Sequence, residues 1–285
     1  MAHLATARRT SPAKLVDPRV SETAPTPGRE RVPVERWLSA AIAVGLLLLW
    51  ELCARTGIIN PTFMPAPSSI LRTLANEIIH GALLRHFSAS LLRVIAGLMV
   101  GAIPGLLAGL AMGWSPRVRQ VADPFVAALH PVPKLALLPL LMVLLGLSDA
   151  PRIAVIALSS FFPMLLSAMA GVRQISPVHF EVARNYGASG LKVLTRVVLP
   201  GSLPMVLTGL RLSANTALAL TIAVEIATAQ SGLGALVWLS WQILNIELLY
   251  ATIVLTALFG VGVNLVLYWL ARRLVPWLPD QQPVL

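Results

Sequence analysis

The sequence predicts an all-α protein that crosses a membrane six times, and three observations support this prediction. Hydrophobic residues make up 56% of the 285 residues, while charged residues make up 12%, about half the share found in soluble domains. Apolar stretches of about 20 residues, the length that a helix needs to cross a bilayer core, recur along the chain. Lysine and arginine gather in a few connections between these stretches, as they do in the cytoplasmic loops of membrane proteins.

The first segment, residues 1–36, is expected to be a disordered, basic cytoplasmic tail. It holds seven basic residues, four acidic residues and five prolines, a composition that cannot bury a core. No small-x-small cleavage site follows the first apolar stretch, so we expect the tail to stay attached. Residues 37–275 form the predicted membrane domain, and residues 276–285 form a short cytoplasmic C-terminal tail.

Five apolar stretches have the length and composition of membrane-spanning helices. They cover residues 37–53, 94–112, 153–172, 206–229 and 251–270. Two shorter helices are expected at the outer surface. One is capped near Ser68, and the other covers residues 236–244 after the turn Gly232-Leu233-Gly234.

A sixth span, residues 121–147, is less regular because charged residues and four prolines interrupt it. Charge placement indicates that it crosses the membrane. Fifteen of the 22 basic residues lie in the N-terminal tail, residues 114–122, residues 173–203 and the C-terminus. These four segments share one face of the membrane only if residues 121–147 cross it. We therefore predict a third span that its prolines kink or partly unwind, with both termini in the cytoplasm.

The longest basic connection, residues 173–203, has the pattern of two short helices joined by a turn. Ser176 followed by Pro177 is typical of a helix start. Gly187 is expected to end this first helix, and a second helix is expected to end at Pro200. The pattern predicts an amphipathic elbow on the cytoplasmic face.

This elbow carries a spaced motif. Glu181, Val182 and Ala183 are followed after three residues by Gly187, and after nine more by Val197, Leu199 and Pro200. The pattern resembles the Glu-Ala-Ala loop signature of permease subunits of bacterial ATP-binding-cassette importers, with valine in place of one alanine and of an isoleucine. Residues 130–140, 208–211 and 232–234 resemble the nitrate, taurine and alkanesulfonate branch of these binding-protein-dependent transport permeases.

The resemblance implies the type I importer permease fold in the inner cell membrane. A homodimer of this chain would form the path for a small anionic solute of the sulfonate, taurine, nitrate or bicarbonate class, delivered by a periplasmic or extracellular binding protein. The elbow would be the coupling helix that docks into a separate cytoplasmic ATPase dimer. Its coupling residues would be Glu181, Ala183, Gly187, Leu199 and Pro200. The alternative is a loop that only lies on lipid headgroups.

No catalytic, cofactor-binding or metal-binding residues are predicted in this chain. A phosphate-binding loop needs Gly-Lys-Ser or Gly-Lys-Thr, whereas the three lysines follow Ala13, Pro133 and Leu191. ATP and magnesium are therefore expected on the partner ATPase. One cysteine, and histidines without partners at ligand spacing, predict no metal centre. The net charge of +10 gives no case for nucleic acid, because most basic residues fall on one predicted side of a bilayer.

Polar residues within the spans are candidates for a translocation path. Arg211, Asn215 and Glu225 lie with Thr208 on one face of the fifth predicted span. They either line a water-filled path or act as an interfacial anchor and as contacts between helices. Lys134 in the third span either attracts an anion or extends toward an interface.

A self-contained secondary transporter is the alternative function. Such proteins ordinarily show inverted repeats and intramembrane acidic ion sites, whereas the spans here hold one candidate acid, Glu225. An ATPase subunit that co-purifies with the chain would indicate the importer. Gradient-driven uptake by this chain alone would indicate the secondary transporter.

Overall fold

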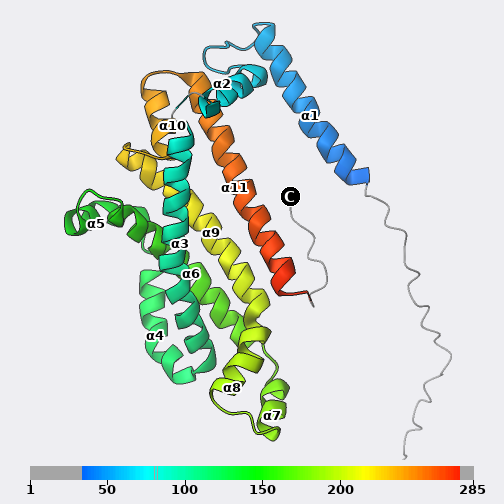
Figure 1. The fold of residues 1–285 in the computed structure, drawn as a ribbon, viewed down its shortest axis with the longest axis vertical. Coiled ribbons are helices and arrows are strands. Elements are labelled where there is room, and N and C mark those ends of the chain that lie inside the picture. Colours follow the sequence, from blue (N-terminus) through cyan, green and yellow to red (C-terminus); the bar gives the residue numbers. More distant parts are fainter. Residues whose placement is uncertain (1–33, 80, 82, 277–285) are drawn as a thin grey trace, which may run out of the picture. The chain divides into compact units, whose positions relative to one another are not determined.

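The computed structural model describes residues 34–276, except residues 80 and 82. Every regular element in this part of the chain is a helix (Figure 1), which confirms the all-α prediction. The contacts divide the chain into two units, residues 1–49 and residues 50–285, and each is described by itself.

Helix α1 (Val34–Arg55) contains the first predicted span and continues from the first unit into the second. Its apolar side chains in the first unit, such as Leu46 and Leu48, are exposed, as expected of a surface that lipid covers. The predicted tails, residues 1–36 and 276–285, lie outside the described residues except at their inner ends.

In the part of the chain that the structure describes, five helices are long and apolar enough to cross a membrane, in agreement with the five regular spans predicted from the sequence. They cover Trp37–Arg55, Leu83–Trp114, Ala150–Arg173, Leu191–Thr228 and Ile246–Leu274. Two of them begin well before the predicted spans, at Leu83 instead of residue 94 and at Leu191 instead of residue 206. The predicted span begins only after Arg93, whereas this side chain belongs to the helix and is buried and paired inside the protein.

The predicted third span is broken, as its prolines indicated. Helix α4 (Pro116–Leu129) is followed by the 3-10 turn Lys134–Leu137 and by helix α5 (Leu138–Leu145), with a bend of 84° between the two halves. Prolines 131 and 133 occupy the break and cannot donate the backbone hydrogen bonds that would continue a helix. The bent pair can be a sixth span by its length and composition, so six crossings and the orientation of the termini stay predictions.

Glycines bring α3 (Leu83–Trp114) and α6 (Ala150–Arg173) into backbone contact. They recur at every fourth position of α3, which places them on one stripe of the helix. A β-carbon on Gly101 would lie 2.1 Å from the carbonyl oxygen of Ala157, and one on Gly109 would lie 2.3 Å from that of Leu165. No side chain fits at these positions unless the two helices separate.

Helix α9 (Leu199–Thr228) packs on the other side of α6 through small residues as well. A β-carbon on Gly209 would lie 2.5 Å from the β-carbon of Ser167. The hydroxyl of Ser213 donates a hydrogen bond of 2.8 Å to the carbonyl of Ser160. Helices α3, α6 and α9 therefore form a closely packed set in the second unit.

Three further helices of the second unit pack together beside this set (Figure 1). They are α2 (Pro67–Ile79), α10 (Leu233–Gln242) and α11 (Ile246–Leu274), and α10 and α11 both contact α9. Leu83, Leu233 and Ala251 meet in the apolar core between them. The two short helices predicted from the sequence are α2 and α10, of which α10 begins three residues before its predicted start.

Candidate functional site

The elbow begins with helix α7 (Pro177–Asn185), which starts at the predicted Ser176-Pro177 step. Gly187 follows the helix with φ of +72°, a left-handed conformation that glycine adopts without steric cost. The turn is closed by a 2.9 Å hydrogen bond from the amide of Ala188 to the carbonyl of Ala183. The predicted end of this helix is therefore confirmed, with Ala183 and Gly187 as the two residues that shape the turn.

The predicted stop at Pro200 is wrong. Residues 191–228 form one continuous helical segment, and Pro200 lies in the first turn of α9. The preceding turn, Leu194–Val198, is a π-helix in which the amide of Leu199 bonds to the carbonyl of Leu194. This wider turn changes the bonding pattern just before the proline, so the missing N–H of Pro200 falls where a new helical register begins.

One face of the elbow packs onto the ends of the helix set. Val193 and Val198 are buried, and they join Val172 of α6 in a small core. Phe180 of α7 and Leu106 of α3 pack against the same core. The elbow is thus seated on α3, α6 and α9 and is not a loose loop.

The other face of the elbow is exposed and partly apolar. Val178, Val182 and Tyr186 recur at every fourth residue and so share one stripe of α7, and Tyr186 is 88% exposed. They line a hollow of about 1030 Å³ together with Lys192 and Pro200. Exposed apolar patches rimmed by charge are typical of surfaces that bind other proteins.

The predicted coupling residues lie at or beside this hollow. Ala183, Gly187 and Pro200 line it. Glu181 is exposed and makes no hydrogen bond or ion pair with the described part of the chain, and Leu199 is exposed as well. The carboxylate of Glu181 is therefore available to a group outside this chain.

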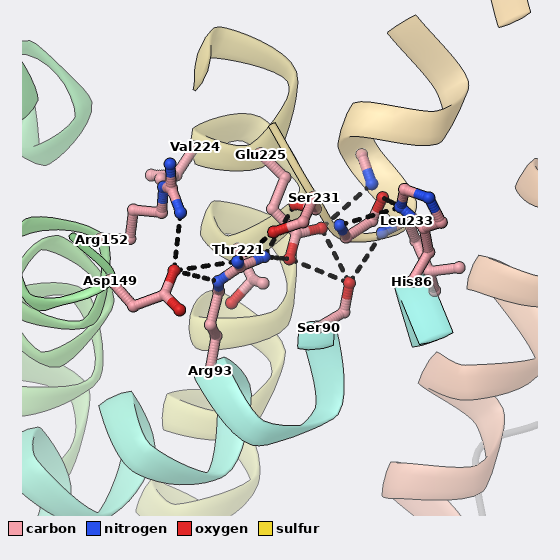
Figure 2. A network of polar contacts seen from close by, with 12 residues as sticks. His86, Ser90, Arg93, Asp149, Arg152, Thr221, Val224, Glu225, Ser231 and Leu233 are labelled. Atoms are coloured by element: carbon pink, nitrogen blue, oxygen red, sulfur yellow. Dashed lines mark hydrogen bonds and ion pairs between the residues drawn. The ribbon is translucent and has the colours of Figure 1, made fainter. Parts of the chain in front are cut away.

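A buried polar network joins α3, α9 and the turn before α6 (Figure 2). It lies at the ends of α6 and α9 that are remote from the elbow. At its centre is Glu225 of α9, whose side chain is 0% exposed. Its carboxylate accepts hydrogen bonds from the hydroxyl of Ser90, at 2.8 Å and 2.9 Å, and from the amide of Gly234, at 3.0 Å. It also forms an ion pair of 2.8 Å with Nη1 of Arg93. The buried charge of Glu225 is neutralised and fully hydrogen-bonded, as a charge inside a membrane protein requires.

The guanidinium of Arg93 joins three segments of the chain. Besides Glu225, it bonds to Oδ1 of Asp149 through Nε at 2.9 Å and to the carbonyl and hydroxyl of Ser231 at 2.8 Å and 2.6 Å. Arg152 donates to the same oxygen of Asp149 at 2.6 Å and to Gln230. Two arginines and two carboxylates therefore balance within the network, with arginine supplying the forked geometry that such a junction needs.

The segment after α9 is shaped around Glu225. Gly232 has φ of +107°, and a β-carbon there would lie 2.1 Å from the carboxyl carbon of Glu225. A β-carbon on Gly234 would lie 2.3 Å from the carbonyl oxygen of Ile222. Both glycines of the Gly-Leu-Gly turn are thus required by the close approach of the chain to the buried acid.

Asp149 forms the solvent-facing side of the network, in the turn before α6, and its side chain is 54% exposed. Partial burial raises the pKa of this carboxyl, but hydrogen bonds from Arg152 and Arg93 and their positive charges outweigh this effect and hold the pKa below its ordinary value. Asp149 is therefore ionised at neutral pH.

Sequence reasoning missed this network. No role for Arg93 or Arg152 is predicted from the sequence. The available signal was that one arginine and one glutamate, Arg93 and Glu225, stand at the ends of apolar stretches, where a charge needs a partner of opposite sign.

The structure places the four residues predicted for a translocation path in three different settings. Asn215 is exposed, and Arg211 is half-buried and makes no hydrogen bond or ion pair with the residues that the structure describes. Glu225 is enclosed in the network. Lys134 lies in the break of the third span, where its ammonium group donates to the carbonyl of His130 and lies 5.1 Å from the ring centre of Phe162. Within the described residues, no group of three or more metal-binding side chains is present.

Comparisons with known proteins show the family of this chain and proteins of similar sequence and fold. Residues 97–278 match the family described as binding-protein-dependent transport system inner membrane component. The chain is 35% identical to the taurine transport system permease protein TauC of Escherichia coli, over 87% of this chain and 92% of that protein. It is 30% identical to the putative aliphatic sulfonates transport permease protein SsuC of Bacillus subtilis, over 88% and 90% respectively. Its fold is similar to that of a chain in inward-facing structures of the MetNI methionine ABC transporter, with a TM-score of 0.58, 17% identity and coverage of 67% of this chain and 95% of that chain.

Proposed function

Because this chain belongs to the family of binding-protein-dependent transport system inner membrane components, we propose that it is the permease subunit of an ATP-driven importer of small organic sulfonates. Two copies would form the path across the inner membrane, with both termini of each copy in the cytoplasm. A solute-binding protein would deliver the substrate from outside. A separate pair of ATPase subunits would bind and hydrolyse ATP with magnesium, and the permease would catalyse no reaction.

The observation that carries this proposal is the exposed hollow of the elbow. It combines an apolar stripe, including Val182 and Tyr186, with the base of α9 and with the carboxylate of Glu181, which has no partner in the described part of the chain. An ATPase surface with an apolar ridge and a basic side chain would complement it. Ala183, Gly187 and Pro200 would set the shape of the contact, and Leu199 would extend it along α9.

The seat of the elbow gives a route from the ATPase to the membrane helices. Val193 and Val198 of the elbow are packed into the same core as Val172 of α6. A displacement of the elbow would therefore move the ends of α6 and α9 together, as alternating access requires. A loop that only rested on lipid headgroups would have no need of this buried seat.

The exposed polar face of α9 is our proposed part of the translocation path. Thr208, Arg211 and Asn215 share this face, and polar groups at membrane depth face a protein interior or a water-filled cavity. The charge of Arg211 has no acidic partner among the described residues, so it can attract an anion. Lys134, at the break of the third span, would add a second positive charge to the path.

The substrate class follows from these charges and from the names of the relatives. Taurine and aliphatic sulfonates carry a sulfonate group that two cationic side chains can attract. Nitrate and bicarbonate share the negative charge and are the smaller anions to compare. Glu225 is neutralised by Arg93, so the acid that would have supported a secondary transporter is not free.

The test is reconstitution in proteoliposomes with the ATPase and binding protein of the same organism. We expect co-purification of the ATPase and ATP-dependent uptake of radiolabelled taurine or butanesulfonate. Glu181→Ala should weaken ATPase binding, whereas Asp123→Ala, which removes an exposed acid on α4, should not. Uptake driven by an ion gradient without the ATPase, or equal ATPase binding by both variants, would contradict the proposal.

A further inference from the structure

The elbow and the buried network stand at opposite ends of the same two helices. Helix α6 begins beside Asp149 and Arg152 of the network and ends at Arg173, directly before the elbow. Helix α9 begins directly after the elbow and ends three residues beyond Glu225. Figure 1 shows α7 and α10 at the two ends of α9.

Between these ends, the helices cannot slide past one another without losing contacts. Gly101 and Gly109 place α3 against the backbone of α6, and Gly209 places α9 against Ser167 of α6. The hydrogen bond from Ser213 to the carbonyl of Ser160 fixes the register of α9 on α6. Such close packing transmits displacement instead of absorbing it.

The network joins α3 to the ends of α6 and α9 that are remote from the elbow. One guanidinium, that of Arg93 on α3, bonds to Glu225 on α9 and to Asp149 at the start of α6. Arg93 and Glu225 are both buried, so separating them would leave the carboxylate of Glu225 without its counter-charge in a low-dielectric environment. Gly232 and Gly234 then bring the chain after α9 down onto the same carboxylate.

We propose that Arg93 and Glu225 are positioning residues for transport, which clamp the remote ends of α3, α6 and α9 so that the three helices move as one lever when the ATPase moves the elbow. This inference rests on the proposed function. Without the clamp, the elbow ends of the helices move while the remote ends lag behind. ATP hydrolysis then continues with less solute moved per ATP.

Coupling is tested on the complete complex in proteoliposomes, with taurine as the probe. Glu225→Gln keeps the size of the side chain and removes the charge that pairs with Arg93. We expect the complex to assemble and the ratio of taurine moved to ATP hydrolysed to fall by about two- to tenfold. The matched control is Glu247→Gln, an exposed acid at the start of α11 whose partner is Thr73, and its ratio should stay at the wild-type value. An unchanged ratio in Glu225→Gln would overturn the inference.

Rigidity is tested separately, without any ATPase. Cys53 is the only cysteine of the chain, so Cys53→Ser gives a cysteine-free background. Spin labels are then attached at Leu147→Cys, two residues before Asp149 of the network, and at Ser189→Cys in the elbow. In nanodiscs, with labelled chain diluted into unlabelled chain, we expect one narrow distance distribution between the labels. Glu225→Gln should broaden it, and an unchanged width would overturn the inference.

The two measurements separate failure of the lever from failure of the proposed function. If the wild-type chain binds no ATPase, the proposed function fails, while the distance distribution still reports whether the network makes the helices one body. If Glu225→Gln does not fold, Arg93→Lys replaces it, because lysine keeps the charge but has one nitrogen in place of the three with which Arg93 reaches its partners. Arg93→Lys should broaden the distribution in the same way, and a wild-type width would overturn the inference.

Discussion

The elbow and the network use the same residue types for opposite purposes. Glu181 in the elbow is exposed and has no partner among the described residues, whereas Glu225 in the network is buried and paired with Arg93. Gly187 has open space around its α-carbon, whereas Gly232 lies against the carboxyl group of Glu225. The residue type alone therefore does not show whether a charge or a glycine stabilises the fold or contacts another protein. The surroundings of the residue show it.

The largest expected effect comes from removing the central cation of the network. Arg93→Met leaves the carboxylate of Glu225 buried without its counter-charge, which should cost about 3–5 kcal/mol in the free energy of unfolding. Denaturant titration in mixed micelles would measure this loss. The double variant Arg93→Met with Glu225→Met removes both charges, so it should recover most of the stability. If the double variant is as unstable as the single one, the ion pair is not the source of the effect.

The comparison of the two glycines gives the next largest effect. Gly232→Ala forces a β-carbon to within 2.1 Å of the Glu225 carboxyl group, at φ of +107°, and should cost about 2–3 kcal/mol. Gly187→Ala suffers only from its left-handed backbone and should cost about 1 kcal/mol. Gly260→Ala, in open space within α11, should be neutral or slightly stabilising. Thermal unfolding in detergent would rank the three variants, and equal losses at positions 187 and 232 would contradict the role assigned to Gly232.

The sequence predicted the helices of this protein because their length and apolar content are local properties. The five regular spans, the broken third span and the turn at Gly187 all depend on residues close together in the chain. The start of α3 at Leu83 and the continuation of the helix through Pro200 were not predicted. Arg93 does not interrupt α3, because its partners Glu225 and Asp149 come from distant parts of the sequence.

The candidate site also has one part that can be predicted from the sequence and one part that cannot. The spacing from Glu181 to Pro200 was visible in the sequence because the elbow is built from consecutive residues. The pairing of Arg93 with Glu225 was not visible, because a single sequence does not show which of several arginines meets a given acid. Pro200 shows a third case, in which the residue was noticed but its effect was misjudged, since a π-turn lets the helix continue past it.

A smaller effect concerns the solvent-facing side of the network. Asp149 has a lowered pKa in the folded protein, so its ionised form favours folding above its ordinary pKa of 3.8, and this contribution is lost as the pH falls further through the folded pKa. Thermal unfolding of wild type and Asp149→Asn should therefore differ at pH 6 and converge below about pH 3.8. A difference that is constant from pH 6 to pH 3 would show that the charge of Asp149 is not responsible.

The smallest effect on stability is expected at the elbow, where a substitution should weaken ATPase binding without destabilising the fold. Tyr186 is 88% exposed, so Tyr186→Ser should change the free energy of unfolding by less than about 0.5 kcal/mol. The same substitution removes the most exposed aromatic side chain of the hollow and should weaken ATPase binding by about tenfold, as loss of an aromatic anchor does at protein interfaces. Phe63→Ser, at an exposed aromatic residue between α1 and α2, is the control and should leave ATPase binding unchanged. Binding to immobilised ATPase would measure the affinity of both variants. If Tyr186→Ser destabilised the fold without weakening this binding, the exposed face of the elbow would be part of the folded core and not a contact surface.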